Sequence, residues 1–343
     1  SLNQREWRGV RDTAYDFASW LKVYGYMAVT LGKHPVALTK SFVRYPWMAS
    51  YLTVANMLDR HKLGLRGKQL RYTQEQFYGV VHNSVDVIAK IIERDENLNS
   101  PNNKRAAKLR AKTVMFDEMT PSIIMAGFPM LDWIDIAMSP VCLPGEVDQN
   151  ANIMYVDAAE RMGLAADVCP LPSAEVGCAI VDDYPQVGSS FITSSMPCDG
   201  SLGAALFMDR YMKKLPSFTL TPPQRFNEPE TNAYAVKDLK NCIRFIEETY
   251  DVKWDWDAFW KKAEEYNKTT KCLLDKWDVN CTPYPQVIGS ALSLQREYEF
   301  QTAACLDSFM TKQEEKVTKM MLKGYEEDRE ADRRDYKYSA IVW

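Results

Sequence analysis

The stretch from Ala165 to Asp209 constrains the fold of this chain more than any other segment. It contains two short apolar runs, Ala165–Val168 and Ser190–Ile192, and each is followed by a loop with a cysteine and then by a helix-starting pattern. Strands that alternate with helices of this length predict a parallel α/β sheet, in which Cys169 and Cys198 occupy equivalent positions after a strand. Ligands collect at the carboxyl ends of such strands, because helix dipoles and free N–H groups point there.

These two cysteines indicate chemistry, and their residue type leaves three interpretations open. A thiol beside a helix N-terminus tends to be deprotonated, and the thiolate is the form that binds metal or attacks an electrophile. Cys169 and Cys198 are therefore interpreted as iron–sulfur ligands, as zinc ligands or redox thiols, or as core cysteines. All three histidines, His34, His61 and His82, precede the predicted sheet. A hydrolase with a histidine base, or a Cys/His zinc site, would therefore need a histidine from the first 82 residues.

The other cysteines are expected to be structural. Eight cysteines in 343 residues are too few for a disulfide scaffold, and a cytoplasmic setting keeps thiols reduced. Cys178, Cys242 and Cys272 lie on apolar stripes, so we expect them in the core.

Charge and hydropathy exclude several classes of partner. The net charge of −4 gives no basic excess, which argues against nucleic acid or an anionic membrane as the main partner. No apolar run approaches the roughly 20 residues that span a bilayer. The first residues do not follow the charged-then-apolar pattern of a signal peptide, so the sequence predicts a cytoplasmic protein.

The changing pattern along the chain predicts four parts. Aromatic and aliphatic residues at helical spacing dominate the first part, and the turn-rich Asn97–Asn103 lies near its end. The predicted parts are a helical N-terminal extension (1–110), an α/β domain (111–231), a helical segment (232–335) and the start of a further strand (336–343). Because the chain stops in this apolar strand, we expect that the natural polypeptide, or its partner chain, continues.

Several elements are predicted within these parts. Besides the two runs described above, Val114–Phe116 and Phe218–Leu220 are expected to be short strands. The expected helices are Pro121–Ala126, Val156–Met162, one that starts near Ser173, Ala233–Thr249, one that starts at Asp255 or Asp257, and Asn267–Trp277.

Four segments in this order resemble one known family. They are MFDEMTPSIIMAGFPML, ERMGLAADVCPLPSAEVG, SSFITSSMPCDGS and LKNCIRFIEETYDVKWDWDAFWKKAEEYNKTTKCLL. Over about residues 113–343 the chain resembles the 2-hydroxyacyl-CoA dehydratases, a family that also includes the subunits of ATP-dependent benzoyl-CoA reductase.

The resemblance implies a site. Family members hold one [4Fe–4S] cluster per subunit through three cysteines, and by position Cys169 and Cys198 match the first two. The third would lie beyond Trp343, in a second α/β half that this sequence lacks. Backbone N–H groups of Leu171–Ala174 and of Asp199–Ser201 are expected to donate to the sulfurs of such a cluster. Glu118 and Ser122 are expected to line an acyl-CoA pocket.

The resemblance also implies an activity and partners. The chain would be one subunit of an oxygen-sensitive heterodimer with a related second subunit. An ATP-dependent iron–sulfur activator protein would supply one electron, which reduces the thioester of an acyl-CoA and leads to loss of water from a 2-hydroxyacyl-CoA. Two alternatives stay open: ring reduction of the benzoyl-CoA reductase type, and a non-catalytic assembly subunit that owns no cluster.

Overall fold

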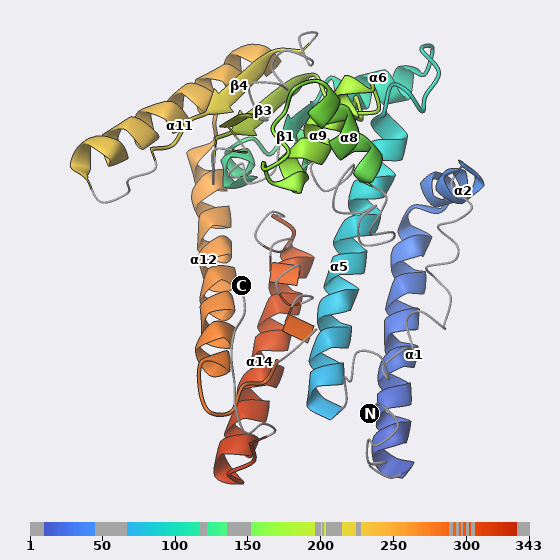
Figure 1. Ribbon diagram of the computed structural model, residues 1–343, viewed down its shortest axis with the longest axis vertical. Helices are drawn as coiled ribbons and strands as arrows, with labels where there is room; N and C mark the ends of the chain where they lie inside the picture. The colour runs from blue at the N-terminus through green and yellow to red at the C-terminus, as the bar shows by residue number, and fades with distance from the viewer. Residues whose placement is uncertain are drawn as a thin grey trace. The chain divides into compact units, whose positions relative to one another are not determined.

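A computed structural model describes most of the chain (Figure 1). The described residues are 10–44, 67–116, 122–135, 152–195, 200, 202–203, 215–223, 228–287, 291–292, 295, 298–299, 302 and 306–334. They belong to two compact units, which we call the α/β unit (Asp86–Lys262) and the helical unit (Ser1–Val85 with Ala263–Trp343). The α/β unit extends beyond the predicted 111–231 range on both sides.

Four parallel strands form the sheet of the α/β unit, which confirms the predicted fold class. They are β1 (Thr113–Phe116), β2 (Asp132–Asp135), β3 (Ser190–Ser194) and β4 (Ser217–Leu220), in the order β2-β1-β3-β4. The two central strands, β1 and β3, are buried along their whole length, as expected for a parallel sheet covered on both faces.

The strand order creates a switch point between β1 and β3. The chain leaves β1 toward β2 on one side and later returns to form β3 on the other side of β1. In open parallel sheets the crevice at such a point, outside the carboxyl ends of the two strands, is where ligands bind.

One predicted strand is wrong. Residues 165–168 form turns between α8 (Ile153–Arg161) and α9 (Pro170–Ile180), with a Val168 N–H to Ala165 O bond of 3.1 Å. Alanine has low strand propensity, and Gly163 adopts a positive φ of 101° that ends α8. Cys169 therefore precedes a helix without following a strand.

Two other local predictions change. The expected helix at Pro121–Ala126 is the 3-10 helix η3 (Ser122–Gly127). The two helices expected around Asp257 and Asn267–Trp277 form one helix, α12 (Trp256–Asn280), because no glycine or proline interrupts the segment between them.

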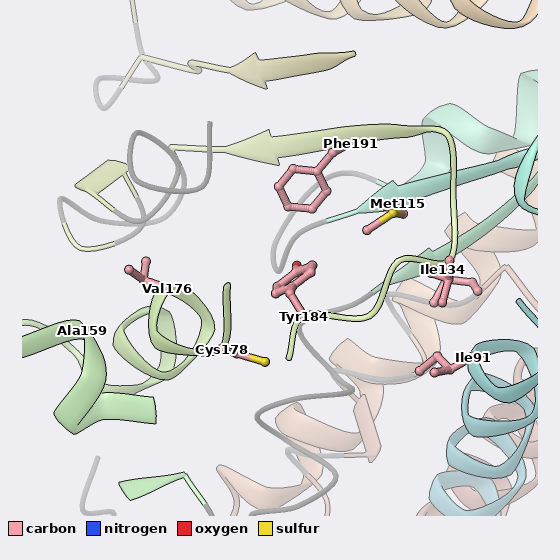
Figure 2. Packing of buried hydrophobic residues seen from close by; sticks show 9 residues of the cluster. Ile91, Met115, Ile134, Ala159, Val176, Cys178, Tyr184 and Phe191 are labelled. Carbon is pink, nitrogen blue, oxygen red and sulfur yellow. The ribbon is translucent and has the colours of Figure 1, made fainter. Parts of the chain in front are cut away.

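The core of the α/β unit lies between the sheet and the helices α8 and α9 (Figure 2). Tyr184 occupies its centre, and its ring packs edge-on against Phe191 at a centroid distance of 5.9 Å. The two helices approach very closely at Gly177, where an added Cβ would lie 1.7 Å from the carbonyl oxygen of Tyr155.

Helix α11 (Pro229–Tyr250) packs along the edge strand β4 through Phe218 and Phe245, whose ring centroids are 5.6 Å apart. It contains the predicted helix Ala233–Thr249. Its last residue, Tyr250, donates a hydrogen bond to the Thr113 carbonyl (2.7 Å). The described helix before the sheet is α6 (Lys104–Arg110), which begins at the turn-rich segment and is capped by Asn103.

The helical unit contains α1 (Val10–Lys33), α2 (Pro35–Arg44) and α14 (Ser308–Glu330), together with parts of α5 (Gly67–Arg94) and α12. Within the predicted helical extension (1–110), the described residues 10–33, 35–44, 67–94 and 104–110 are helical, and residues 95–103 form turns. α14 packs on α5, where Tyr72 donates to the Met320 carbonyl (3.2 Å). His82 hydrogen-bonds with Asp307, the N-cap of α14, at 2.9 Å.

A buried ionic cluster joins α12 to α14. The Lys276 ammonium lies 2.6 Å from a Glu314 carboxylate oxygen and 3.1 Å from one of Glu299. The side chains of Lys276 and Glu314 are fully buried. Trp277 and Gln295 donate to Glu299 at 2.8 and 2.9 Å. We call Lys276, Glu299 and Glu314 the buried triad.

The buried triad predicts a pH dependence of stability. Burial raises the pKa of Glu314, and the Lys276 ammonium opposes only part of that effect. The folded state therefore binds this proton more tightly than the unfolded state, so the contribution of Glu314 to stability falls as pH rises above about 4.5. We expect the free energy of unfolding of the wild type, measured by urea unfolding, to fall relative to that of Glu314→Gln as the pH rises above about 4.5.

A Glu264→Gln variant is the matched control, because Glu264 is exposed on α12. Its stability difference from the wild type should not follow this trend. A Glu314→Gln difference that stays constant between about pH 4.5 and 8 contradicts the prediction.

None of the helices among the described residues is long and apolar enough to cross a membrane.

Candidate functional site

The carboxyl edge of the sheet brings the ends of β1, β3 and β4 together. The Ser195 N–H donates to the Leu220 carbonyl (2.9 Å), which extends the pairing of β3 and β4 by one residue. The hydroxyls of Thr193 and Thr219 are 2.8 Å apart. In the sequence Glu118 comes after β1 and Cys198 comes after β3, and these two strands are neighbours at the switch point.

Cys169 is an exposed, free cysteine at the N-cap position of α9. Its side chain makes no capping hydrogen bond, while its carbonyl accepts from both the N–H (3.3 Å) and the hydroxyl (2.9 Å) of Ser173. Pro170 and Pro172 have no N–H group. In the first turn of α9, Leu171 is therefore the residue whose N–H can donate to a ligand. The expected donors at 171–174 are reduced to this one.

The accessible thiol of Cys169 suits a cluster or metal ligand, since thiolates hold iron–sulfur clusters. Cys198 lies outside the described residues, as does Glu118. Among the residues that the structure describes, no group of three or more His, Cys, Asp and Glu side chains is arranged to hold a metal ion. The pairing of Cys169 with Cys198 therefore stays a prediction.

Ser122 is the first residue of η3 and is buried, with 6% of its surface exposed. The indole of Trp254 packs directly on the last residue of η3, because a Cβ added to Gly127 would lie only 2.5 Å from it. The Asp255 N–H donates to the Gly127 carbonyl (2.8 Å). The structure thus fixes η3 firmly, while a role of Ser122 in binding an acyl group stays a prediction.

The cysteines expected in the core are buried to different degrees. Cys178 and Cys242 are 1% and 0% exposed, and burial raises the pKa of each thiol to about 12. Both predictions are confirmed, and thiols held neutral in this way are poor metal ligands. Cys272 is half-buried, and burial also raises its pKa.

One polar group at this edge escaped sequence reasoning. The Asp238 carboxylate on α11 accepts a hydrogen bond from the Thr221 N–H (2.7 Å), just after β4 ends. The exposed Tyr234 hydroxyl lies 3.0 Å from the Thr221 hydroxyl. Asp238 belongs to an ordinary amphipathic helix pattern, so no signal in the sequence distinguishes it.

Comparison with known proteins gives a family for this chain. No curated protein matches the chain. Among protein families, 2-hydroxyglutaryl-CoA dehydratase, D-component, matches residues 146–334, a range that includes α9, β3, β4 and α11. Because the match covers more than half of the 343 residues, this chain belongs to the 2-hydroxyglutaryl-CoA dehydratase D-component family.

Proposed function

We propose that this chain is a subunit of an oxygen-sensitive iron–sulfur enzyme that uses one-electron reduction of an acyl-CoA thioester to eliminate water from a 2-hydroxyacyl-CoA. The observation that carries the proposal is the exposed, unpaired Cys169 at the start of α9, inside the range that matches the dehydratase family.

The topology favours a place for Cys169 near the switch point. After α9 the chain reaches the amino edge of the sheet, where the Ser189 N–H donates to the carbonyl of Thr113, the first residue of β1 (3.0 Å). A crossover helix that precedes a parallel strand runs antiparallel to it. The N-terminal end of α9 is then directed toward the carboxyl edge, where β3 ends before Cys198 in the sequence.

In this proposal Cys169 and Cys198 hold a [4Fe–4S] cluster. The cluster, when bound, supplies a single electron at low potential to the thioester carbonyl. The residues of this chain would position the cluster and shield it from water. Pro170 and Pro172 stiffen the loop around Cys169, and the Leu171 N–H is free to donate to a cluster sulfur.

The acyl-CoA is expected to bind along the loop after β1. Glu118 and Ser122 follow β1 in the sequence, and β1 ends next to β3 at the switch point. Burial of Ser122 and the rigid packing of η3 would exclude water from the reacting thioester. A related second subunit and an ATP-dependent iron–sulfur activator complete the proposed system.

The test is the iron and acid-labile sulfide content of the chain purified without oxygen. We expect about four irons per chain in the wild type, as a [4Fe–4S] cluster requires, and less than a tenth of that in Cys169→Ser or Cys198→Ser. Cys281→Ser is the matched control, because Cys281 is also an exposed free cysteine but lies after α12 in the helical unit. It should keep its iron.

Other outcomes point elsewhere. An iron-free wild type that still binds a related subunit favours the non-catalytic assembly role. A loaded enzyme that reduces an aromatic acyl-CoA but dehydrates no 2-hydroxyacyl-CoA favours the reductase alternative.

A further inference from the structure

The first turns of α12 carry two exposed tryptophans. Trp256 and Trp260 are 54% and 60% exposed, although burial of an indole ring is strongly favourable. They are four residues apart in the helix, so their side chains are neighbours on the same side of α12. A ligand that covers both rings would remove a large apolar area from water.

The two indoles and the ring of Phe259 form three sides of a slot. The indole rings are close to parallel, with an interplanar angle of 25° and a centroid distance of 6.4 Å. The Phe259 ring stands at 87° to Trp256 and at 70° to Trp260. We call these three side chains the aromatic slot, with the indoles as its walls and the phenyl ring as its floor.

The dimensions of the aromatic slot suit one flat ring. A ring at the midpoint between the indoles would lie about 3.2 Å from each centroid, close to the contact distance of carbon atoms. It would lie about 4.5 Å from the Phe259 centroid, within the range of edge-to-face aromatic pairs. A planar aromatic group can therefore contact all three rings after small side-chain shifts.

Charged side chains of both signs flank the aromatic slot along the chain. Lys253 precedes it and is 87% exposed, with a long ion pair of 3.7 Å to Glu247. Lys261 directly follows it and is exposed, as is Asp257 within it. Ammonium groups suit phosphates and a carboxylate suits an amino group. An adenine nucleotide presents this combination on a flat ring.

The aromatic slot adjoins the segment in which the acyl group is proposed to bind. The ring of Trp254 lies 5.4 Å from that of Trp256 and 5.1 Å from that of Phe259, and it packs on Gly127 at the end of η3. Ser122 begins η3, about 10 Å away along the 3-10 helix. An acyl-CoA carries its adenine and its thioester at opposite ends of a long flexible arm, so both places can be occupied at once.

We propose that the aromatic slot binds the adenine ring of the acyl-CoA, stacked between Trp256 and Trp260, with Lys253 and Lys261 beside its phosphates. This inference rests on the proposed function, because that function supplies the acyl-CoA. It adds a subsite that holds the substrate by its nucleotide end, away from the reacting thioester.

Titration calorimetry of the full chain, purified without oxygen, tests the proposal. The probe is adenosine 3′,5′-bisphosphate, which reproduces the nucleotide end of CoA without the thioester. We expect the Kd to rise at least about tenfold in Trp260→Ala, because one stacking face is lost. Trp260→Phe keeps a flat ring, so its Kd should stay within about threefold of the wild-type value. Leu274→Ala is the matched control and should keep the wild-type Kd, since Leu274 is 59% exposed on the same helix.

Ribose 5-phosphate separates ring binding from phosphate binding. It lacks the base, so we expect its Kd to be at least about tenfold higher than that of the nucleotide. The proposal is overturned if the wild type does not bind the nucleotide, if ribose 5-phosphate binds equally well, or if Trp260→Ala keeps the wild-type Kd. A Trp260→Ala chain that binds the nucleotide normally but no longer binds a related subunit also overturns it, and identifies the slot as a protein contact.

These binding constants are separate from the test of the proposed activity. The probe has no thioester and does not react, so its Kd is measured whether or not the chain contains iron. A chain that holds iron but shows no effect of Trp260→Ala refutes the slot and leaves the proposed function standing. An iron-free chain with the expected Kd pattern supports the slot, while the proposed function fails.

Discussion

Replacing Lys276 with methionine is expected to lower the free energy of unfolding by about 3–5 kcal/mol. The ammonium is fully buried between Glu299 and Glu314, and its removal leaves two carboxylates in a low-dielectric interior without their counter-charge. The measurement is urea unfolding followed by circular dichroism at neutral pH. Lys271→Met is the matched control, because Lys271 pairs with Asp275 at the exposed surface of α12. That change should cost less than about 1 kcal/mol.

The charge explanation makes a second prediction. In the triple variant Lys276→Met, Glu299→Gln, Glu314→Leu no ionised group stays in the cluster, so most of the lost stability should return. Two results would contradict this explanation. One is a Lys276→Met protein with the same free energy of unfolding as Lys271→Met, and the other is a triple variant with a lower free energy of unfolding than Lys276→Met.

Replacing Gly177 with alanine is expected to cost at least about 2 kcal/mol. The new Cβ would lie 1.7 Å from the carbonyl oxygen of Tyr155, a backbone atom that can move only if α8 and α9 separate. Alanine favours a helix by about 1 kcal/mol over glycine, so intrinsic propensity alone predicts the opposite sign. Thermal and urea unfolding give the sign directly.

Asp157→Ala is the control for this variant. Asp157 is exposed on α8, next to the same contact, and its replacement should change the stability by no more than about 0.5 kcal/mol. A Gly177→Ala protein that is more stable than the wild type would show that the helices are not in close contact.

The prediction of elements succeeded where local pattern decides the structure. The apolar runs at Ser190–Ile192 and Phe218–Leu220 are parts of β3 and β4, and the stripe at Ala233–Thr249 lies within α11. Short-range periodicity and propensity are enough for such segments, because each one buries a single continuous face or run.

The same reasoning failed at Ala165–Val168. The four residues of this segment include two alanines and Asp167, which are poor strand formers, and the positive φ of Gly163 favoured a turn. As a consequence the two cysteines are not equivalent: Cys169 begins a helix after a turn, whereas Cys198 follows β3. The candidate site was found from the cysteine pattern, although one of its two supporting strands does not exist.

The sequence by itself determined the parallel α/β class, the positions of most helices, the buried Cys178 and Cys242, and the family. The tertiary structure decided which strands are neighbours and which distant residues meet. Lys276 meets Glu299 and Glu314, and Gly177 meets Tyr155, across gaps of 22 to 38 residues. The physical reason is that secondary structure depends on interactions within a few residues along the chain. Contacts between elements depend on how whole faces pack, and no short stretch of sequence contains that information.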